Sequence, residues 1–476
     1  MNKYIQITRS EFIHLIRSPF KIVTLLLFIL SVIYGCQNGY DLIKKHNSEI
    51  MSINTSNYEL ISKMIMQYEA IENGDEEKPR RDPTTPYWAI WNTPSYALKY
   101  PSPMMVFSLG QSEQYGYYKR VTNWSSTFDS DLAEEIANPE RLAVGTLDFN
   151  FVVTYLLPIL IIILLFNIGG LEKDLRFNQL VYLQNISKER WLFFRFLFYF
   201  IITIISLFVL VLCYGFLAEV FKSEMTSFIG LFFTIFLYIL FWFTIFYFIN
   251  YSGNGSSEQA IKMISAWLAF CVIIPGIIHQ YTSIKYPANY MTDYLDVSRD
   301  QSNEIFALPS DTLQMKLLDE FPTLENTLYA SDTIMDKSII NRSVSGLVNI
   351  LNKNIATAIE HSNEEKNKFI ENFYIINPVI AFQNQINVLT KTDYHAYQRY
   401  RNYIQSIIDK KIELILDDTW NKVVVNKDRY INYVETFDEK LQSIMYFKKK
   451  LLTLDIITFK KIIIFVYINL YKRWKN

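Results

Sequence analysis

The sequence predicts a mainly α-helical, polytopic membrane protein with six transmembrane helices and two extracytoplasmic domains. Half of the 476 residues are hydrophobic and 16% are aromatic, yet 20% are charged, so apolar spans must alternate with water-soluble parts. Five apolar stretches have about the length that a bilayer crossing requires, roughly 17–25 residues. Two polar segments, 36–150 and 282–455, separate apolar stretches and are too long to be simple connections.

The first elements are an amphipathic helix and the first span. Residues 1–19 contain the stretch YIQITRSEFIHLIRSP, whose mixture of apolar and charged residues predicts a helix lying at the cytoplasmic membrane surface. The first span follows at 20–35. It ends in Gly35-Cys36, a pair that also occurs at lipoprotein cleavage sites, but Tyr34 fits such a site poorly. We therefore interpret this segment as an uncleaved helix.

The central part of the chain, 151–281, is predicted to hold the second to fifth spans. Pro275 should kink the fifth of them. The four spans are predicted at 151–168, 191–220, 228–249 and 263–281.

A sixth span is predicted at 456–471, followed by a cytoplasmic tail at 472–476. Lys460 and Lys461 interrupt its apolar sequence. The stretch either crosses the membrane, with both lysines reaching toward an interface, or lies on the membrane surface as an amphipathic helix. We favour the span.

Basic residues flanking the spans predict the orientation. They gather before the first span, in the loop 169–190, beside the Gly/Ser-rich loop after the fourth span, and in the tail 472–476. Because cytoplasmic loops carry an excess of Lys and Arg, these parts and the N-terminus are predicted to be cytoplasmic. The segments 36–150 and 282–455 then lie outside.

The second polar segment reads as mainly helical. Tyr394, Tyr397, Tyr400 and Tyr403 recur every three residues and should share one helix face. Such a stripe either lines a path for an apolar substrate or is the packing face of an amphipathic helix, and packing is the more common case. Asn377-Pro378 should separate two helices, since the residue before a proline avoids helical geometry.

Several classes of chemistry have no sequence support. The three cysteines and five histidines show no spacing typical of a metal site, so no metal ligands are predicted. The chain has no GxxxxGK[ST] phosphate loop and no GxSxG nucleophile motif, so neither catalytic nor cofactor-binding residues are predicted. Its net charge of −1 gives no indication of nucleic-acid binding. These observations favour a membrane subunit driven by a partner.

Four stretches are spread along the chain in the order that one protein family shows: 102–122, 142–166, 256–277 and 377–400. They resemble the ABC-2 type permeases of ATP-binding-cassette transporters. The resemblance is to the branch with large outer domains between spans one and two and between spans five and six. Within the four stretches, the resemblance assigns Pro158, Trp267 and Pro275 to a substrate path or gate.

The loop 169–190 also resembles that family's loop after the second span. The family pattern begins Glu-Arg-Glu-x-Gly-Thr-Leu, and Arg176 stands at the position of its glycine. The resemblance implies that this loop forms a coupling helix docking on a separate ATPase; on its own, the same loop reads as a solvated turn whose charges only set topology. The implied coupling residues are Glu172, Lys173, Asp174, Arg176, Gln184, Ser187 and Lys188.

The resemblance implies a permease subunit, and we expect an exporter in the bacterial cytoplasmic membrane. ATP and Mg²⁺ would be bound by a cytoplasmic ATPase subunit and not by this chain. The other expected partners are a second permease chain, identical or related, and the lipid bilayer. The main alternative is an ATPase-driven membrane complex that does mechanical or envelope-remodelling work without moving a solute. A polytopic enzyme would require a catalytic cluster, which the sequence does not show.

Overall fold

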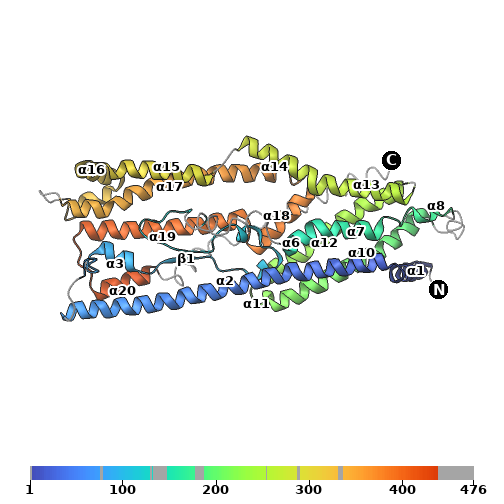
Figure 1. Ribbon diagram of the computed structural model, residues 1–476, viewed down its shortest axis with the longest axis horizontal. Coiled ribbons are helices and arrows are strands. Elements are labelled where there is room, and N and C mark those ends of the chain that lie inside the picture. The colour runs from blue at the N-terminus through green and yellow to red at the C-terminus, as the bar shows by residue number, and fades with distance from the viewer. Residues whose placement is uncertain are drawn as a thin grey trace.

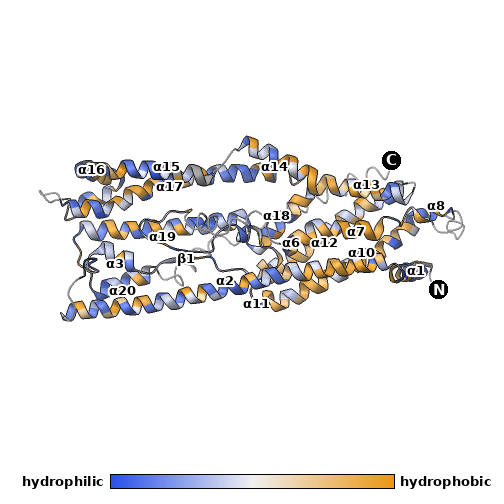
Figure 2. Ribbon diagram, in the orientation of Figure 1, coloured by the Kyte–Doolittle hydropathy of each residue, from blue (hydrophilic) through white to orange (hydrophobic). Residues whose placement is uncertain are grey.

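The computed structural model describes residues 3–74, 79–128, 131, 147–176, 187–253, 255–286, 290–330 and 336–437. The described chain is a mainly helical, elongated molecule (Figure 1). One half is an apolar helical bundle, and the other half is a lobe of mixed hydropathy (Figure 2). We refer to these halves as the bundle and the lobe. The predicted sixth span 456–471 and the tail 472–476 lie outside the described residues.

The first two helices follow each other at a proline. Helix α1 (Lys3–Arg17) forms where the amphipathic helix was predicted, and Pro19 then occupies the first turn of α2 (Pro19–Asn73). Helix α2 has 55 residues and continues past residue 35, where the predicted span ends, through the bundle and along the lobe (Figure 1). It stops at Gly74, whose left-handed backbone (φ 78°) closes the helix C-terminus.

Within the part of the chain that the structure describes, four helical segments are long and apolar enough to cross a membrane, as in a mainly α-helical membrane protein. They are α2, α10 (Lys188–Leu217), α12 (Met225–Ser252) and the continuous segment Ser256–Lys285. The last is built from α13 (Ser256–Leu268), the π-helical η4 (Ala269–Ile273) and α14 (Ile274–Lys285).

A shorter apolar segment, Phe149–Leu165, forms at the predicted second span and lies in the centre of the bundle. It consists of α6 (Phe149–Phe151), the π-helical η3 (Val152–Leu156) and α7 (Leu157–Leu165). Two four-residue helices lie at opposite ends of the bundle: α8 (Leu171–Asp174) after α7, and α11 (Val220–Ser223) between α10 and α12.

The lobe combines both polar segments of the sequence. Two short strands pair antiparallel, with Tyr96 opposite Arg120, and the connection between them contains two 3₁₀ turns. Residues of the first turn are buried in the core of the bundle. From the first polar segment come α3 (Pro86–Asn92), β1 (Tyr96–Leu98), η1 (Pro103–Phe107), η2 (Gly110–Glu113) and β2 (Tyr118–Arg120). From the second come α15 (Tyr290–Phe306), α16 (Ser310–Glu320), η5 (Pro322–Asn326), α17 (Lys337–Glu371), α19 (Tyr394–Trp420) and α20 (Lys427–Thr436).

In its described residues the second polar segment is mainly helical, as expected. Of the four tyrosines in the stripe, Tyr397, Tyr400 and Tyr403 are buried in the core between α17 and α19, so this part of the stripe is a packing face. Tyr394 is only half-buried, and its hydroxyl donates to Glu360. The predicted break also forms: α17 ends at Glu371, and α18 (Pro378–Thr390) begins after Asn377. Helix α18 does not remain in the lobe. Its apolar residues join the core of the bundle.

Two glycines allow α2 to pass close to other backbone segments where bundle and lobe meet. A Cβ atom at Gly35 would lie 2.7 Å from the backbone nitrogen of Phe149, and one at Gly39 would lie 2.7 Å from the carbonyl oxygen of Val106. Only a residue without a side chain fits against backbone atoms at such distances. Close packing of α2 against the backbone at Phe149 therefore accounts for the glycine at position 35.

Replacing Gly39 by alanine should destabilise the protein by roughly 1–3 kcal/mol, because η1 must shift away from α2. Gly276→Ala is the matched control, since a Cβ atom at Gly276 would have no neighbour within 4 Å. Thermal unfolding in detergent should show a lower transition temperature for Gly39→Ala only. Equal transitions for the two variants would contradict the close approach.

Lys411 of α19 ties the core of the lobe to α3. Its side chain is fully buried, and Nζ donates hydrogen bonds to the carbonyl oxygens of Ile90 (3.0 Å) and Thr93 (3.3 Å). A cation at this place complements the C-terminal end of α3. Burial, together with the nearby charge of Arg120, lowers the pKa of Lys411 to about 7.

This pKa predicts a pH-dependent stability. The folded protein binds the Lys411 proton less tightly than the unfolded chain does. Below pH 7 folding therefore carries the full cost of burying a charged lysine, and this cost disappears as the pH rises from about 7 toward 10.5. The wild type should therefore gain up to about 1.4 kcal/mol per pH unit relative to Lys411→Met between pH 7 and 9. Thermal unfolding across this range measures the difference. Lys410→Met, at the neighbouring position with a 42% exposed side chain, should keep the wild-type slope. An identical slope in Lys411→Met would refute the assignment.

Candidate functional site

Helix α8, at the predicted coupling loop, is held by a buried arginine. Arg195 of α10 donates from Nη1 to Glu172 (2.6 Å) and to the carbonyl oxygen of Ile168 (2.8 Å), and from Nε to Glu11 of α1 (2.5 Å). Arg195 and Glu11 are nearly inaccessible to solvent. One guanidinium thus joins α1, the end of the central apolar segment, α8 and α10 through charge-assisted hydrogen bonds.

The other two charges of α8 bind the loop that precedes α13. Nζ of Lys173 donates to the carbonyl oxygen of Gly253 (2.7 Å), and the Asp174 carboxylate accepts from the backbone N–H of Ser256 (3.1 Å). Gly170 makes the approach sterically feasible, because a Cβ atom there would lie 2.3 Å from the Ser256 nitrogen. Helix α8 is therefore fixed on both sides by its own chain.

The start of α10 is anchored in the same region. Ser187 is the N-cap of α10 and accepts from the backbone N–H of Arg190. Lys188 donates to the carbonyl oxygen of Tyr251 (2.6 Å), at the end of α12, and lies over the Tyr251 ring. Gln184, the remaining predicted coupling residue, lies outside the described residues.

Leu175 and Arg176, directly after α8, are exposed, as is Asp174 at its last position. The Leu175 side chain is 57% exposed although it is apolar, and Arg176 is also exposed. Arg176 has a left-handed backbone (φ 62°), the conformation that favours glycine. This is the position at which the ABC-2 pattern has its glycine.

A second buried cation lies beside the first. Lys21 of α2 donates to the carbonyl oxygen of Leu164 (2.9 Å), to Tyr199 (3.2 Å) and to Asn167 (3.3 Å). The sequence places Lys21 among the charges flanking the first span, and its burial was not predicted. Lys21 and Arg195 together satisfy carbonyl groups at the end of the central apolar segment, where a helix attracts cations.

The predicted gate residues Pro158, Trp267 and Pro275 lie at two helix irregularities. Pro158 follows the π-helical η3, and Pro275 follows the π-helical η4. Trp267 links these two segments, because its indole N–H donates to the carbonyl oxygen of Tyr155 in η3 (3.2 Å). The structure thus places Trp267 against the irregular turn that precedes Pro158, while Pro275 lies two turns further along the same helical segment as Trp267.

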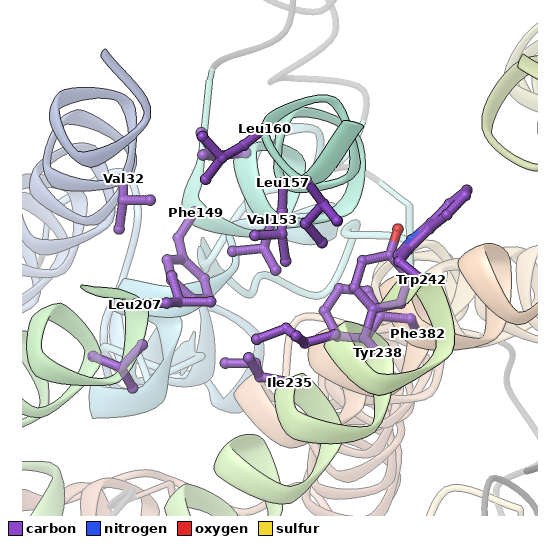
Figure 3. Close-up of a cluster of buried hydrophobic side chains, with 14 of the residues drawn as sticks. Val32, Phe149, Val153, Leu157, Leu160, Leu207, Ile235, Tyr238, Trp242 and Phe382 are labelled. Carbon is purple, nitrogen blue, oxygen red and sulfur yellow. The ribbon is translucent and has the colours of Figure 1, made fainter. Parts of the chain in front are cut away.

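Helix α18 packs between these irregular segments, as sequence reasoning did not foresee. Phe382 of α18 stacks on Tyr238 of α12, with ring centroids 3.8 Å apart (Figure 3). Asn150 donates to Asn387 Oδ1 (2.9 Å) and to the carbonyl oxygen of Gln383 (3.2 Å), both in α18. A polar Asn150 at the start of an apolar run was the available signal, because such a residue needs partners inside the bundle.

The Arg195 cluster predicts a large effect of charge removal. Arg195→Gln leaves Glu11 and Glu172 without their partner in a buried site, which should cost about 3–5 kcal/mol. Lys262→Gln is the control, because Lys262 pairs with Glu258 on the surface, where an ion pair contributes about 0–1 kcal/mol. Thermal unfolding in detergent should separate the two variants. Combining Arg195→Gln with Glu11→Gln and Glu172→Gln should recover part of the loss, and the absence of any recovery would argue against the charge cluster.

No group of three or more His, Cys, Asp or Glu side chains that could hold a metal ion occurs among the residues that the structure describes. Comparison with known proteins adds no family: no family model, no curated protein and no solved structure matches the chain.

Proposed function

We propose that this chain is the membrane-spanning permease subunit of an ABC-2 type transporter, an exporter driven by ATP hydrolysis on a separate cytoplasmic ATPase. In this proposal the end of the bundle that carries α1 and α8 faces the cytoplasm, and the lobe lies outside the membrane. ATP and Mg²⁺ belong to the ATPase, and a second permease chain completes the assembly.

The observation that carries the proposal is the attachment of α8. Leu175 and Arg176 are exposed directly after the helix, while Glu172, Lys173 and Asp174 bind neighbouring helices and loops of the same chain. A push on such a helix moves the ends of several spans together, as coupling to a motor requires. A merely solvated turn would not need a buried arginine at its base.

The backbone at Arg176 supports the resemblance independently of the charges. A left-handed residue follows α8 at the position of the family glycine. The side chain differs, but the turn geometry is the one that the glycine would supply.

The docking surface can be tested with the double variant Leu175→Glu/Arg176→Glu. We expect the loss of at least nine-tenths of the ATPase that co-purifies with the chain in mild detergent, because an apolar contact and a positive charge are both removed. Both residues point outward, so thermal stability should stay near that of the wild type. Val424→Glu, at a 71% exposed position of the lobe, is the control and should retain the ATPase. Wild-type retention of the ATPase by the double variant would exclude docking at α8.

The alternative function, mechanical work without solute transport, is favoured by a different observation. Helix α2 runs without interruption from the bundle along the lobe, so a tilt at one end reaches the other directly. Reconstitution with the ATPase in vesicles distinguishes the two functions. Accumulation of a solute upon ATP addition supports transport, and ATP-dependent movement of the lobe without accumulation supports mechanical work.

A further inference from the structure

Two apolar helical segments of the bundle share one structural feature, a π-helical turn followed by a proline. In the first, the N–H of Leu157 bonds the Val152 carbonyl five residues back, and Pro158 follows. In the second, the N–H of Ile274 bonds the Ala269 carbonyl, and Pro275 follows. The longer turn diverts one N–H from its usual acceptor, and proline supplies none. Each segment therefore releases carbonyl groups in an apolar environment.

In each segment, a side chain from another part of the chain binds one of the released carbonyl groups. Pro158 has no N–H for the Thr154 carbonyl, which instead accepts from the Tyr238 hydroxyl of α12 (2.6 Å). In the second segment the Ile274 N–H bonds the Ala269 carbonyl and not the Phe270 carbonyl. The next residue, Pro275, has no N–H to donate to the Phe270 carbonyl. This carbonyl accepts from Nδ2 of Asn377 (2.9 Å). An unpaired carbonyl in hydrocarbon costs several kcal/mol, so these donors determine whether each irregular turn persists.

Asn377 makes the second of these bonds while it also begins α18. Its Oδ1 accepts from the backbone N–H of Val379 (3.0 Å) as the N-cap of α18, and the residue is completely buried. One side-chain amide thus connects the two elements: its oxygen caps α18, and its nitrogen donates to the carbonyl group in η4. The preceding residues Ile375 and Ile376 are each 58% exposed and apolar.

Helix α18 also reaches the first irregular turn. Phe382 stacks on the ring of Tyr238, whose hydroxyl holds the Thr154 carbonyl (Figure 3). Asn150, directly before η3, donates to Asn387 and Gln383 of α18. One short helix from the second polar segment therefore contacts the supports of both π turns.

We infer that α18 is a latch that connects the lobe to two proline hinges in the bundle. With α18 seated, Asn377 and Tyr238 hold the carbonyl groups that the hinges release, and both apolar segments keep one bend. Withdrawal of α18 toward the lobe removes the Asn377 donor and the support of Tyr238, so the hinges must change register or bend to recover their hydrogen bonds. This inference concerns the chain alone and does not depend on the proposed function.

The test uses Asn377→Ser, with amide hydrogen exchange of the full-length protein in detergent as the readout. Serine retains an oxygen to cap α18 but is too short to reach the Phe270 carbonyl. We expect exchange in 270–285 to rise on the order of tenfold, as for the loss of one hydrogen bond. Asn426→Ser is the matched control, because the Asn426 side chain caps α20 by accepting from the backbone N–H of Arg429 at an exposed site. It should leave 270–285 unchanged.

Tyr238→Phe tests the first hinge separately. It removes only the hydroxyl that binds the Thr154 carbonyl and keeps the ring that stacks on Phe382. Exchange should rise in 156–165 and stay unchanged in the lobe helix 394–420. The latch is refuted if Asn377→Ser raises exchange only within 378–390, or if exchange at the hinges stays at the control level. If Asn377→Ser does not fold, the Tyr238→Phe result decides alone.

Discussion

The bundle depends on how the backbone carbonyl groups of its central helix are satisfied. Helix α7 has only nine residues and is surrounded by other helices, so water cannot serve the carbonyl groups before and after it. Tyr238 and Trp267 serve the side toward the lobe, and Lys21 and Arg195 serve the opposite side. These donors come from α12, α13, α2 and α10. The packing arrangement of the bundle is thus also its hydrogen-bonding arrangement, and neither can change alone.

The two sides of α7 use different chemistry for the same purpose. Toward the lobe the donors are the neutral Tyr238 hydroxyl and Trp267 indole, so a sliding helix there breaks neutral hydrogen bonds and separates no charges. At the α8 end the donors are cations, and Arg195 also binds two carboxylates. Separating that cluster exposes buried charge, which is far more costly than breaking a neutral hydrogen bond. The α8 end therefore behaves as the rigid base of the bundle, while the side toward the lobe is where rearrangement costs least.

Local sequence patterns predicted what depends on neighbouring residues. Apolar run length located the spanning helices, the spacing of Tyr397, Tyr400 and Tyr403 located a packing face, and Asn377-Pro378 located a helix boundary. Long-range partners were not accessible in this way. From the sequence, Lys21 is one of the charges near the first span, and only the structure shows its hydrogen bonds to Leu164 and Tyr199. Similarly, the sequence places α18 in the second polar segment, and only the structure shows Phe382 stacked on Tyr238 in the bundle. The continuity of α2 was hidden because its apolar half and its polar half have different compositions but the same helical geometry.

That continuity gives α2 the properties of a lever arm. The contacts at Gly35 and Gly39 lie between base and tip and act as the fulcrum, because backbone against backbone leaves no side chain to yield. At 1.5 Å per residue, the arm from Gly39 to the end of α2 at Asn73 is on the order of 50 Å long, so a tilt of about 5° around the fulcrum displaces the tip by about 4 Å. A tilt too small to disturb the packing of the bundle is thereby converted into a displacement of several Å at the tip.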